Sequence, residues 1–226
     1  MRRSLVTILL LAILTAVEAG AQSPRSATLV KAGRLIDPRT GTVLSPAAVL
    51  IEDGRIRRVG TPAQVQADVP SAARVVDLGS ATLLPGLIDG HTHLLLDVIV
   101  PQEAQVKRMT FSGEFEPGLL LAVAGMTPGA RVLLGARLAR EDLESGFTTV
   151  RNVGHSGIDG DVALRDAINA GRVPGPRMLA SGRKIIASGD YIQSLNPAVA
   201  PSIAEQEFLF LDGADSARRA VRANAF

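Results

Sequence analysis

The 226-residue chain is 46% hydrophobic and 20% charged, which is typical of a globular protein rather than a disordered one. The formal net charge of +2, the single tyrosine and the absence of tryptophan exclude a typical nucleic-acid-binding surface. The chain contains no cysteine, which excludes disulfides, thiolate zinc sites and cysteine nucleophiles.

The first 21 residues have the features of a signal peptide. Arg2 and Arg3 provide positive charge, an apolar run extends from Leu5 to Val17, and Ala19-Gly20-Ala21 is a small-residue cleavage pattern. The run is shorter than the ~20 residues that span a bilayer. We therefore expect export to the periplasm or the medium, with no stable membrane anchor after cleavage. A buried N-terminal helix is the alternative interpretation.

Residues 22–84 contain short β-forming segments separated by turns. The predicted strands are Thr28–Ile36, Ala47–Glu52, Arg55–Val59, Arg74–Leu78 and Ala81–Leu84. Asp53-Gly54 is typical of a hairpin turn between the second and third of these strands. The segment predicts a small, mostly antiparallel β domain, whose modest core needs a neighbour to pack against.

Residues 85–226 alternate between strand and helix patterns. The predicted elements are an apolar strand over 83–89, a helix from Thr127-Pro128 to Gly146, a strand over 147–152, a helix over 161–170, a strand over 178–181 and a helix over 215–225. This alternation predicts an α/β fold with parallel strands. Since a closed (β/α)8 barrel needs eight strands and about 250 residues, the segment is either the incomplete start of a TIM-like barrel or a smaller open sheet.

Two histidines, His91 and His93, follow the apolar strand directly. Residues i and i+2 of a strand point to the same face, so two imidazoles are expected side by side. Such a pair suits a divalent metal such as zinc. A His-x-His pair alone is a weak signal, but burying both rings of an apolar strand without a ligand or partner would be costly.

The string from Leu84 to His93, LPGLIDGHTH, closely resembles the first-strand signature of the amidohydrolase superfamily. The upstream segment Val49–Ile56 resembles the N-terminal β-sandwich half of that superfamily. Two further segments, Gly146–Gly154 and Gly175–Gly182, look like the branch that contains imidazolonepropionase-like enzymes and metal-dependent Xaa-Pro dipeptidases. The resemblance covers nearly all of the chain from about residue 28 onward.

The resemblance implies a (β/α)8 metal-dependent hydrolase barrel, with residues 22–84 as its β-sandwich part. It also implies one or two zinc-like ions bound partly by His91 and His93, and hydrolysis of an amide or other C–N bond by metal-activated water. The expected substrate is a small molecule such as an Xaa-Pro or related dipeptide. A homo-oligomer is left open.

The sequence departs from the family pattern after His93. His155 is the only later histidine, and Lys184 follows the predicted third strand rather than lying on the fourth, where the family has a bridging lysine or glutamate. We expect the catalytic residues in a missing C-terminal half, because a catalytic zinc typically takes three protein ligands. The 226-residue chain is therefore expected to be a fragment with little activity.

Some other residues are weaker candidates. His155 and Tyr191 are predicted to contact substrate, although a solvated loop histidine is the alternative for His155. Asp97 is more typical of a loop or helix cap than of a ligand. Residues 109–124 form either a lid or an elaborated connection.

Two rival functions remain open from the sequence. One is a non-catalytic binding or assembly protein that retains the start of the fold, with exposed strand edges covered by a partner. The other is a different chemistry of the same superfamily, such as cyclic amide hydrolysis or deamination of a ring.

Overall fold

The computed structural model describes residues 26–96, 125–188, 196, 198 and 200–225. The chain divides into two compact units, of which the first ends at Pro85 and the second begins at Gly86. The predicted signal peptide, residues 1–21, lies outside the described residues, so the predicted domain scheme as a whole stays a prediction. Within the described ranges, no helix is both long and apolar enough to cross a membrane.

The first unit is built from two small sheets. The four-stranded sheet has the order β5-β4-β1-β6, from Arg55–Gly60, Ala47–Glu52, Ala27–Ala32 and Arg74–Asp77. The three-stranded sheet has the order β3-β2-β7, from Thr42–Leu44, Arg34–Asp37 and Thr82–Leu83. The strand predicted over 28–36 is therefore split into β1 and β2, which join different sheets.

A short helix closes the core of this unit. Helix α2, Pro62–Gln66, is capped by the Thr61 side chain, which accepts a hydrogen bond from the Gln64 amide. Its buried Val65 packs with Leu29 and Leu50 from the four-stranded sheet. This cluster is small, as expected for a β unit of this length.

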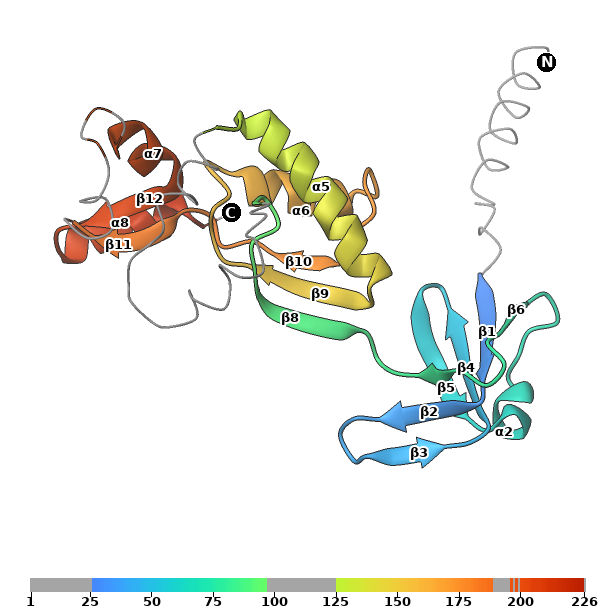
Figure 1. The fold of residues 1–226 in the computed structure, drawn as a ribbon. Helices are drawn as coiled ribbons and strands as arrows, with labels where there is room; N and C mark the ends of the chain where they lie inside the picture. The colour runs from blue at the N-terminus through green and yellow to red at the C-terminus, as the bar shows by residue number, and fades with distance from the viewer. Residues whose placement is uncertain (1–25, 97–124, 189–195, 197, 199, 226) are drawn as a thin grey trace, which may run out of the picture. The chain divides into compact units, whose positions relative to one another are not determined.

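The second unit begins with three parallel strands in the order β10-β9-β8, from Arg177–Leu179, Phe147–Asn152 and Leu87–Thr92. Helices α5, Pro128–Glu144, and α6, Gly160–Asn169, cover one face of this sheet (Figure 1). The buried residues on that face include Val150, Met178, Ala139 and Leu164. Three sequential parallel strands with a helix after each of the first two match the start of a (β/α) barrel, and the described residues form no closed barrel. This agrees with the predicted incomplete barrel.

The opposite face of this sheet is more exposed. Ile88 of β8 is 73% exposed and Leu179 of β10 is 55% exposed, and their register partners on β9 are Thr149 and Arg151. Helices α5 and α6 cover the face that carries Val150, so the apolar strand before His91 is not buried on both sides.

Of the elements that follow β10, the sequence predicted the last helix, over 215–225, but not the two strands and the helix before it. Strand β11, Lys184–Ala187, pairs in parallel with β12, Phe208–Leu211, and forms a separate two-stranded sheet. Helix α7, Ala200–Glu207, leads directly into β12, and α8, Ala214–Ala223, follows it. These elements bring residues near position 184 and position 207 back to the carboxyl end of β9.

Candidate metal centre

His91 and His93 lie at the carboxyl end of β8. The strand ends at Thr92, so only His91 belongs to it, and the pairing with β9 shifts register between Asp89 and Thr92. The two rings nevertheless lie together, with centroids 5.3 Å apart and planes at 77°. The structure thus brings the two predicted metal ligands close together, although not in the side-by-side arrangement of a regular strand.

Backbone contacts with β9 hold the segment that carries these histidines. The side-chain oxygen of Asn152 accepts a hydrogen bond from the Leu94 amide at 2.9 Å, and the Val153 amide donates to the Thr92 carbonyl at 3.0 Å. Arg151 donates from Nε to the Gly90 carbonyl at 2.7 Å. Arg151 and Asn152 therefore fix the main chain on both sides of His91.

Asp89 acts on the backbone rather than on a ring. Its carboxylate accepts a hydrogen bond from the His91 amide at 2.8 Å. This contact shapes the turn at the end of the strand.

The ring of His93 is oriented by the main chain of the next loop. Its Nδ1 lies 3.2 Å from the carbonyl oxygen of Gly154. Since a carbonyl can only accept, Nδ1 carries the proton and Nε2 is left as the ligand atom. Burial lowers the pKa of His93, against the raising effect of the Gly154 carbonyl, and the charges of Lys184 and His91 lower it further. The ring is therefore neutral at neutral pH, which is the form that binds metals.

The third histidine of the chain lies beside this pair. The His155 ring centroid is 5.0 Å from that of His93, and His155 is only 2% exposed. The alternative of a solvated loop histidine is therefore wrong. Its predicted contact with substrate stays a prediction.

His155 is joined to Lys184, at the start of β11. The Lys184 ammonium lies within hydrogen-bonding distance of His155 Nε2. Burial, followed by the charges of Lys184, His93 and Arg131, lowers the pKa of His155 to about 3. Burial also lowers the pKa of Lys184 to about 8, although the charge of Glu207 opposes this shift. With these pKa values, His155 is neutral at neutral pH and can accept a hydrogen bond from the Lys184 cation.

A buried ion pair lies behind His155. Arg131 of α5 and Glu207 of α7 are 2.6 Å apart and are 1% and 0% exposed. Neither residue is predicted from the sequence. Arg131 lies in the first turn of a helix with no unusual pattern, and Glu207 ends a helix that was not predicted. Because the two residues are far apart in the sequence, no local pattern indicates that they pair.

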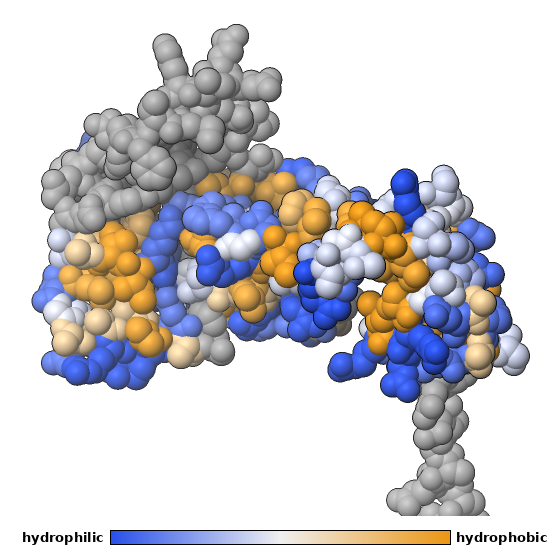
Figure 2. Space-filling model, turned by 90° about the horizontal axis from the view of Figure 1, so that it is seen from below, coloured by the Kyte–Doolittle hydropathy of each residue, from blue (hydrophilic) through white to orange (hydrophobic). Residues whose placement is uncertain are grey.

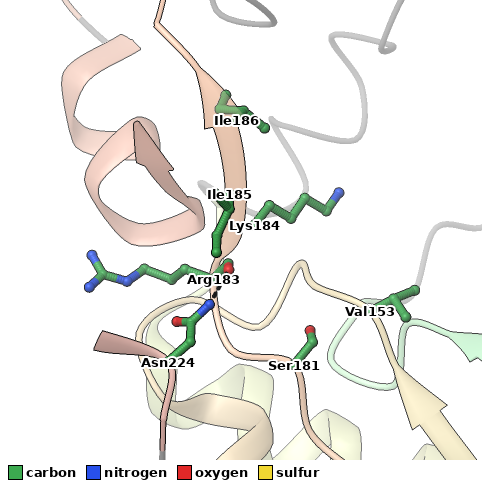
Figure 3. A pocket seen from close by; sticks show the side chains of 7 residues that line it. All are labelled: Val153, Ser181, Arg183, Lys184, Ile185, Ile186 and Asn224. Carbon is green, nitrogen blue, oxygen red and sulfur yellow. Dashed lines mark hydrogen bonds between the residues drawn. The ribbon is translucent and has the colours of Figure 1, made fainter. Parts of the chain in front are cut away.

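A shallow cavity of about 410 Å³ opens next to this cluster. It is lined by Val153, Ser181, Arg183, Lys184, Ile185, Ile186 and Asn224. Lys184 extends toward the side where Val153 lies, whereas the Arg183 side chain points the opposite way (Figure 3). The cavity therefore places one cation and several apolar side chains next to the histidine cluster.

The described residues bring together two candidate metal ligands rather than a full set. Among residues 26–96, 125–188 and 200–225, no group of three or more His, Asp or Glu side chains is arranged to hold a metal ion. His91 and His93 fit a divalent metal by donor type, proximity and, for His93, protonation state. Tyr191, Asp97 and residues 109–124 lie outside the described residues, and their predicted roles stay predictions.

Comparisons with known proteins identify the family of the chain. A sequence model described as the amidohydrolase family matches residues 82–223. Imidazolonepropionase of Deinococcus radiodurans is 32% identical over 130 residues, which cover 54% of this chain and 32% of that protein. Imidazolonepropionase of Micrococcus luteus is 47% identical over 62 residues, or 27% of this chain and 14% of that protein.

Solved structures show the same fold. A Xaa-Pro dipeptidase with bound methionine superposes with a TM-score of 0.60 and 27% identity, covering 88% of this chain and 44% of that one. Ochratoxinase of A. niger gives a TM-score of 0.68 at 23% identity, covering 89% and 44%, and at that identity it shows the fold alone. This chain thus spans less than half the length of these relatives. With the family match over most of its length, the chain belongs to the amidohydrolase family.

Proposed function

We propose that the chain provides the first two metal ligands of a divalent-metal-dependent hydrolase that cleaves a C–N bond in a small molecule. The observation that carries the proposal is the pair His91 and His93 at the end of β8, with centroids 5.3 Å apart. In parallel β/α barrels, active sites form at the carboxyl ends of the strands.

The chain prepares these ligands before any metal arrives. The Gly154 carbonyl holds the Nδ1 proton of His93 and leaves Nε2 as the donor atom, while Asn152 and Arg151 fix the backbone around His91. A divalent metal bound there would polarise the scissile carbonyl and lower the pKa of an attacking water. Zinc is the ion proposed, because imidazole nitrogens suit it well.

The substrate class is proposed from the relatives. The similar structure of a Xaa-Pro dipeptidase suggests a dipeptide or a related small amide. The imidazolonepropionase relatives favour a cyclic substrate as the second candidate. His155 and Tyr191 are proposed to contact the substrate.

Metal binding by the 226-residue chain tests the site. Zinc affinity is measured by competition with a chromophoric chelator for the wild type, His91→Ala, His93→Ala and the double variant. We expect each single variant to weaken binding at least about tenfold, because one of two donors is lost. Glu141→Gln, on the exposed surface of α5, is the control and should bind like the wild type. Wild-type affinity in the double variant would refute the proposed site.

Activity is tested separately. The chain with added zinc is assayed against Xaa-Pro dipeptides, N-acyl amino acids and cyclic amides. Since two protein ligands fall short of the three that catalytic zinc typically takes, we propose that the 226-residue chain alone turns these substrates over slowly or not at all. Rapid turnover would contradict this fragment proposal without affecting the proposed metal ligands.

Export is proposed from the N-terminal sequence alone. We expect the protein expressed in a bacterium to be cleaved after Ala21, so that the exported form begins at Gln22. Mass spectrometry of the periplasmic and medium fractions checks this mass. An uncleaved protein found only in the cytoplasm would contradict it.

A further inference from the structure

We propose that Arg131 and Glu207 are positioning residues for the metal pair, acting through the loop that follows β9. The inference rests on the proposed metal site. It concerns two buried charges that do not touch the metal ligands themselves, and it explains what their burial achieves.

The two side chains come from distant helices and meet beneath the loop. Arg131 lies in the first turn of α5, and Glu207 is the last residue of α7. Their N–O distance of 2.6 Å and their near-zero exposure make this a fully buried ion pair. Such pairs are costly to bury and add little to stability compared with apolar packing. A role in holding a particular backbone geometry is the better explanation.

Both charges hydrogen-bond to the backbone of that loop. Arg131 donates from its second terminal nitrogen to the His155 carbonyl. Glu207 accepts a hydrogen bond from the Gly157 amide at 3.1 Å through the same oxygen that meets Arg131. The ion pair therefore binds the loop backbone at two points, one carbonyl and one amide.

The loop needs such support because its conformation is uncommon. His155 has a φ of +57°, a left-handed value that is rare for residues other than glycine. Gly154, just before it, has a φ of +105°. Strained backbone of this kind persists where the surroundings over-determine it.

The geometry of the loop is passed on to His93 by two contacts. The Gly154 carbonyl accepts from His93 Nδ1, and the His155 ring lies 5.0 Å from the His93 ring. If the loop relaxes, the carbonyl moves away and the His93 ring loses both its fixed tautomer and its fixed direction. Groups that orient a metal-binding histidine through its second nitrogen typically affect metal affinity about 10- to 100-fold.

Glu207→Gln tests the proposal, because it removes the charge but keeps the shape and one acceptor. Two quantities are measured on the 226-residue chain: zinc affinity by chelator competition, and the tautomer of His93 by ¹⁵N-detected NMR. We expect the variant to bind zinc at least about tenfold more weakly. Its metal-free His93 should show a mixture of tautomers in place of the Nδ1–H form. A merely structural role would lower stability without changing the tautomer of the folded protein.

Glu141→Gln is the matched control. It breaks an Arg–Glu pair on the same helix, Arg137–Glu141, whose side chains are both 53% exposed. We expect its zinc affinity and its His93 tautomer to equal those of the wild type. A folded Glu207→Gln protein with wild-type values for both measurements would overturn the inference.

Arg131→Lys provides a second variant that keeps the buried charge but cannot hold Glu207 and the His155 carbonyl with one planar group. The same loss of affinity is expected. Should both variants fail to fold, the wild type decides, since a mixed His93 tautomer in the metal-free protein overturns the inference. Unchanged zinc binding in the double variant His91→Ala/His93→Ala would refute the proposed metal site itself, which separates the two failures.

Discussion

Nδ1 of His93 lies 3.2 Å from the carbonyl oxygen of Gly154, a contact that joins the ends of two neighbouring parallel strands. The contact sets which nitrogen of the ring is available to a metal. It also makes the candidate site depend on the conformation of a loop that is distant from His93 in the sequence. Gly154 belongs to the turn after β9 rather than to β8.

Gly154→Ala should damage both stability and metal binding. At a φ of +105°, an added Cβ would lie 2.6 Å from Cε of Lys184 and 2.8 Å from its Cγ. We expect a loss of about 2–3 kcal/mol in the free energy of unfolding, from strain and overlap together. Urea denaturation checks this value. Zinc affinity should fall as well, because the carbonyl that orients His93 must shift.

Gly171→Ala is the control for backbone strain alone. Its φ is +66°, but no atom lies within 4 Å of the added Cβ. We expect a loss of only about 1 kcal/mol, with unchanged zinc affinity. Equal effects of the two substitutions would contradict the role given to the close approach of Lys184.

Asp161→Ala should destabilise the second unit strongly. The buried Asp161 carboxylate accepts hydrogen bonds from the Ser181 and Gly182 amides, both at 3.0 Å, and so ties α6 to the end of β10. Its removal leaves two buried or half-buried amides without that acceptor, at a cost of about 3 kcal/mol. Urea denaturation followed by circular dichroism measures it.

Asp166→Ala, on the same helix, is the matched control for Asp161. Asp166 is exposed and pairs with the neighbouring Arg165. We expect a change within about 0.5 kcal/mol. A loss as large as that of Asp161→Ala would show that helix propensity, rather than the buried hydrogen bonds, decides the result.

Asp142→Asn should change the pH dependence of stability. Burial raises the pKa of Asp142 above its ordinary value of 3.8, and the charges of Asp89 and Glu141 raise it further. In the window above pH 3.8 the folded state therefore holds more protons at this site than the unfolded state, so stability falls as pH rises. The asparagine variant lacks this loss, and its stability relative to the wild type should increase from acid to neutral pH.

Urea denaturation of both proteins between acid and neutral pH gives this difference directly. Asp89→Asn provides a cross-check, because it removes one of the charges that raise the pKa of Asp142. In that background the effect of Asp142→Asn should shrink. A stability difference that stays constant across the pH range would contradict the assigned shift.

Ile88→Lys combined with Leu179→Lys should reduce self-association of the 226-residue chain. In the sheet register, Ile88 pairs with Thr149 and Leu179 pairs with Arg151, on the face that α5 and α6 leave uncovered. Figure 2 views the molecule from below and shows orange hydrophobic surface beside blue hydrophilic residues. Exposed apolar sheet faces favour association and dye binding.

Analytical ultracentrifugation and binding of a hydrophobic dye measure this effect. Leu133→Lys is the control, since Leu133 is 75% exposed but lies on α5 rather than on the sheet. We expect the control to associate and bind dye like the wild type. An equal reduction by the control would show that surface charge in general, and not the uncovered sheet face, governs association.

The sequence was sufficient for the parts of the structure that depend on local patterns. Alternating strand and helix signals predicted β9, α5 and α6 to within a few residues, and the apolar run before His91 placed His91 and His93 at the end of a strand. Such elements are marked by the spacing of their hydrophobic residues and by capping residues at their ends, and residues close in the sequence determine both. The same reasoning placed two histidines together but could not give the direction of either ring.

The rest depends on contacts between residues far apart in the chain. Nothing near His155 indicates that it is buried, because Lys184 and Arg131, which surround it, arrive from β11 and α5. The run Phe208–Leu211 is too short to distinguish a strand from a helix by periodicity, so β12 and its partner were missed. Long-range pairing, rather than local preference, decides these elements.

The contact between Glu207 and the Gly157 amide also bears on the order in which the molecule matures. Synthesis proceeds from the N-terminus, so His91 and His93 emerge well before α7 exists. A nascent chain at that stage has both imidazoles but lacks the glutamate that fixes the loop beside them. If Glu207 positions the pair as proposed, tight binding of a cation would await the docking of α7 and would begin only after the later part of the polypeptide has folded.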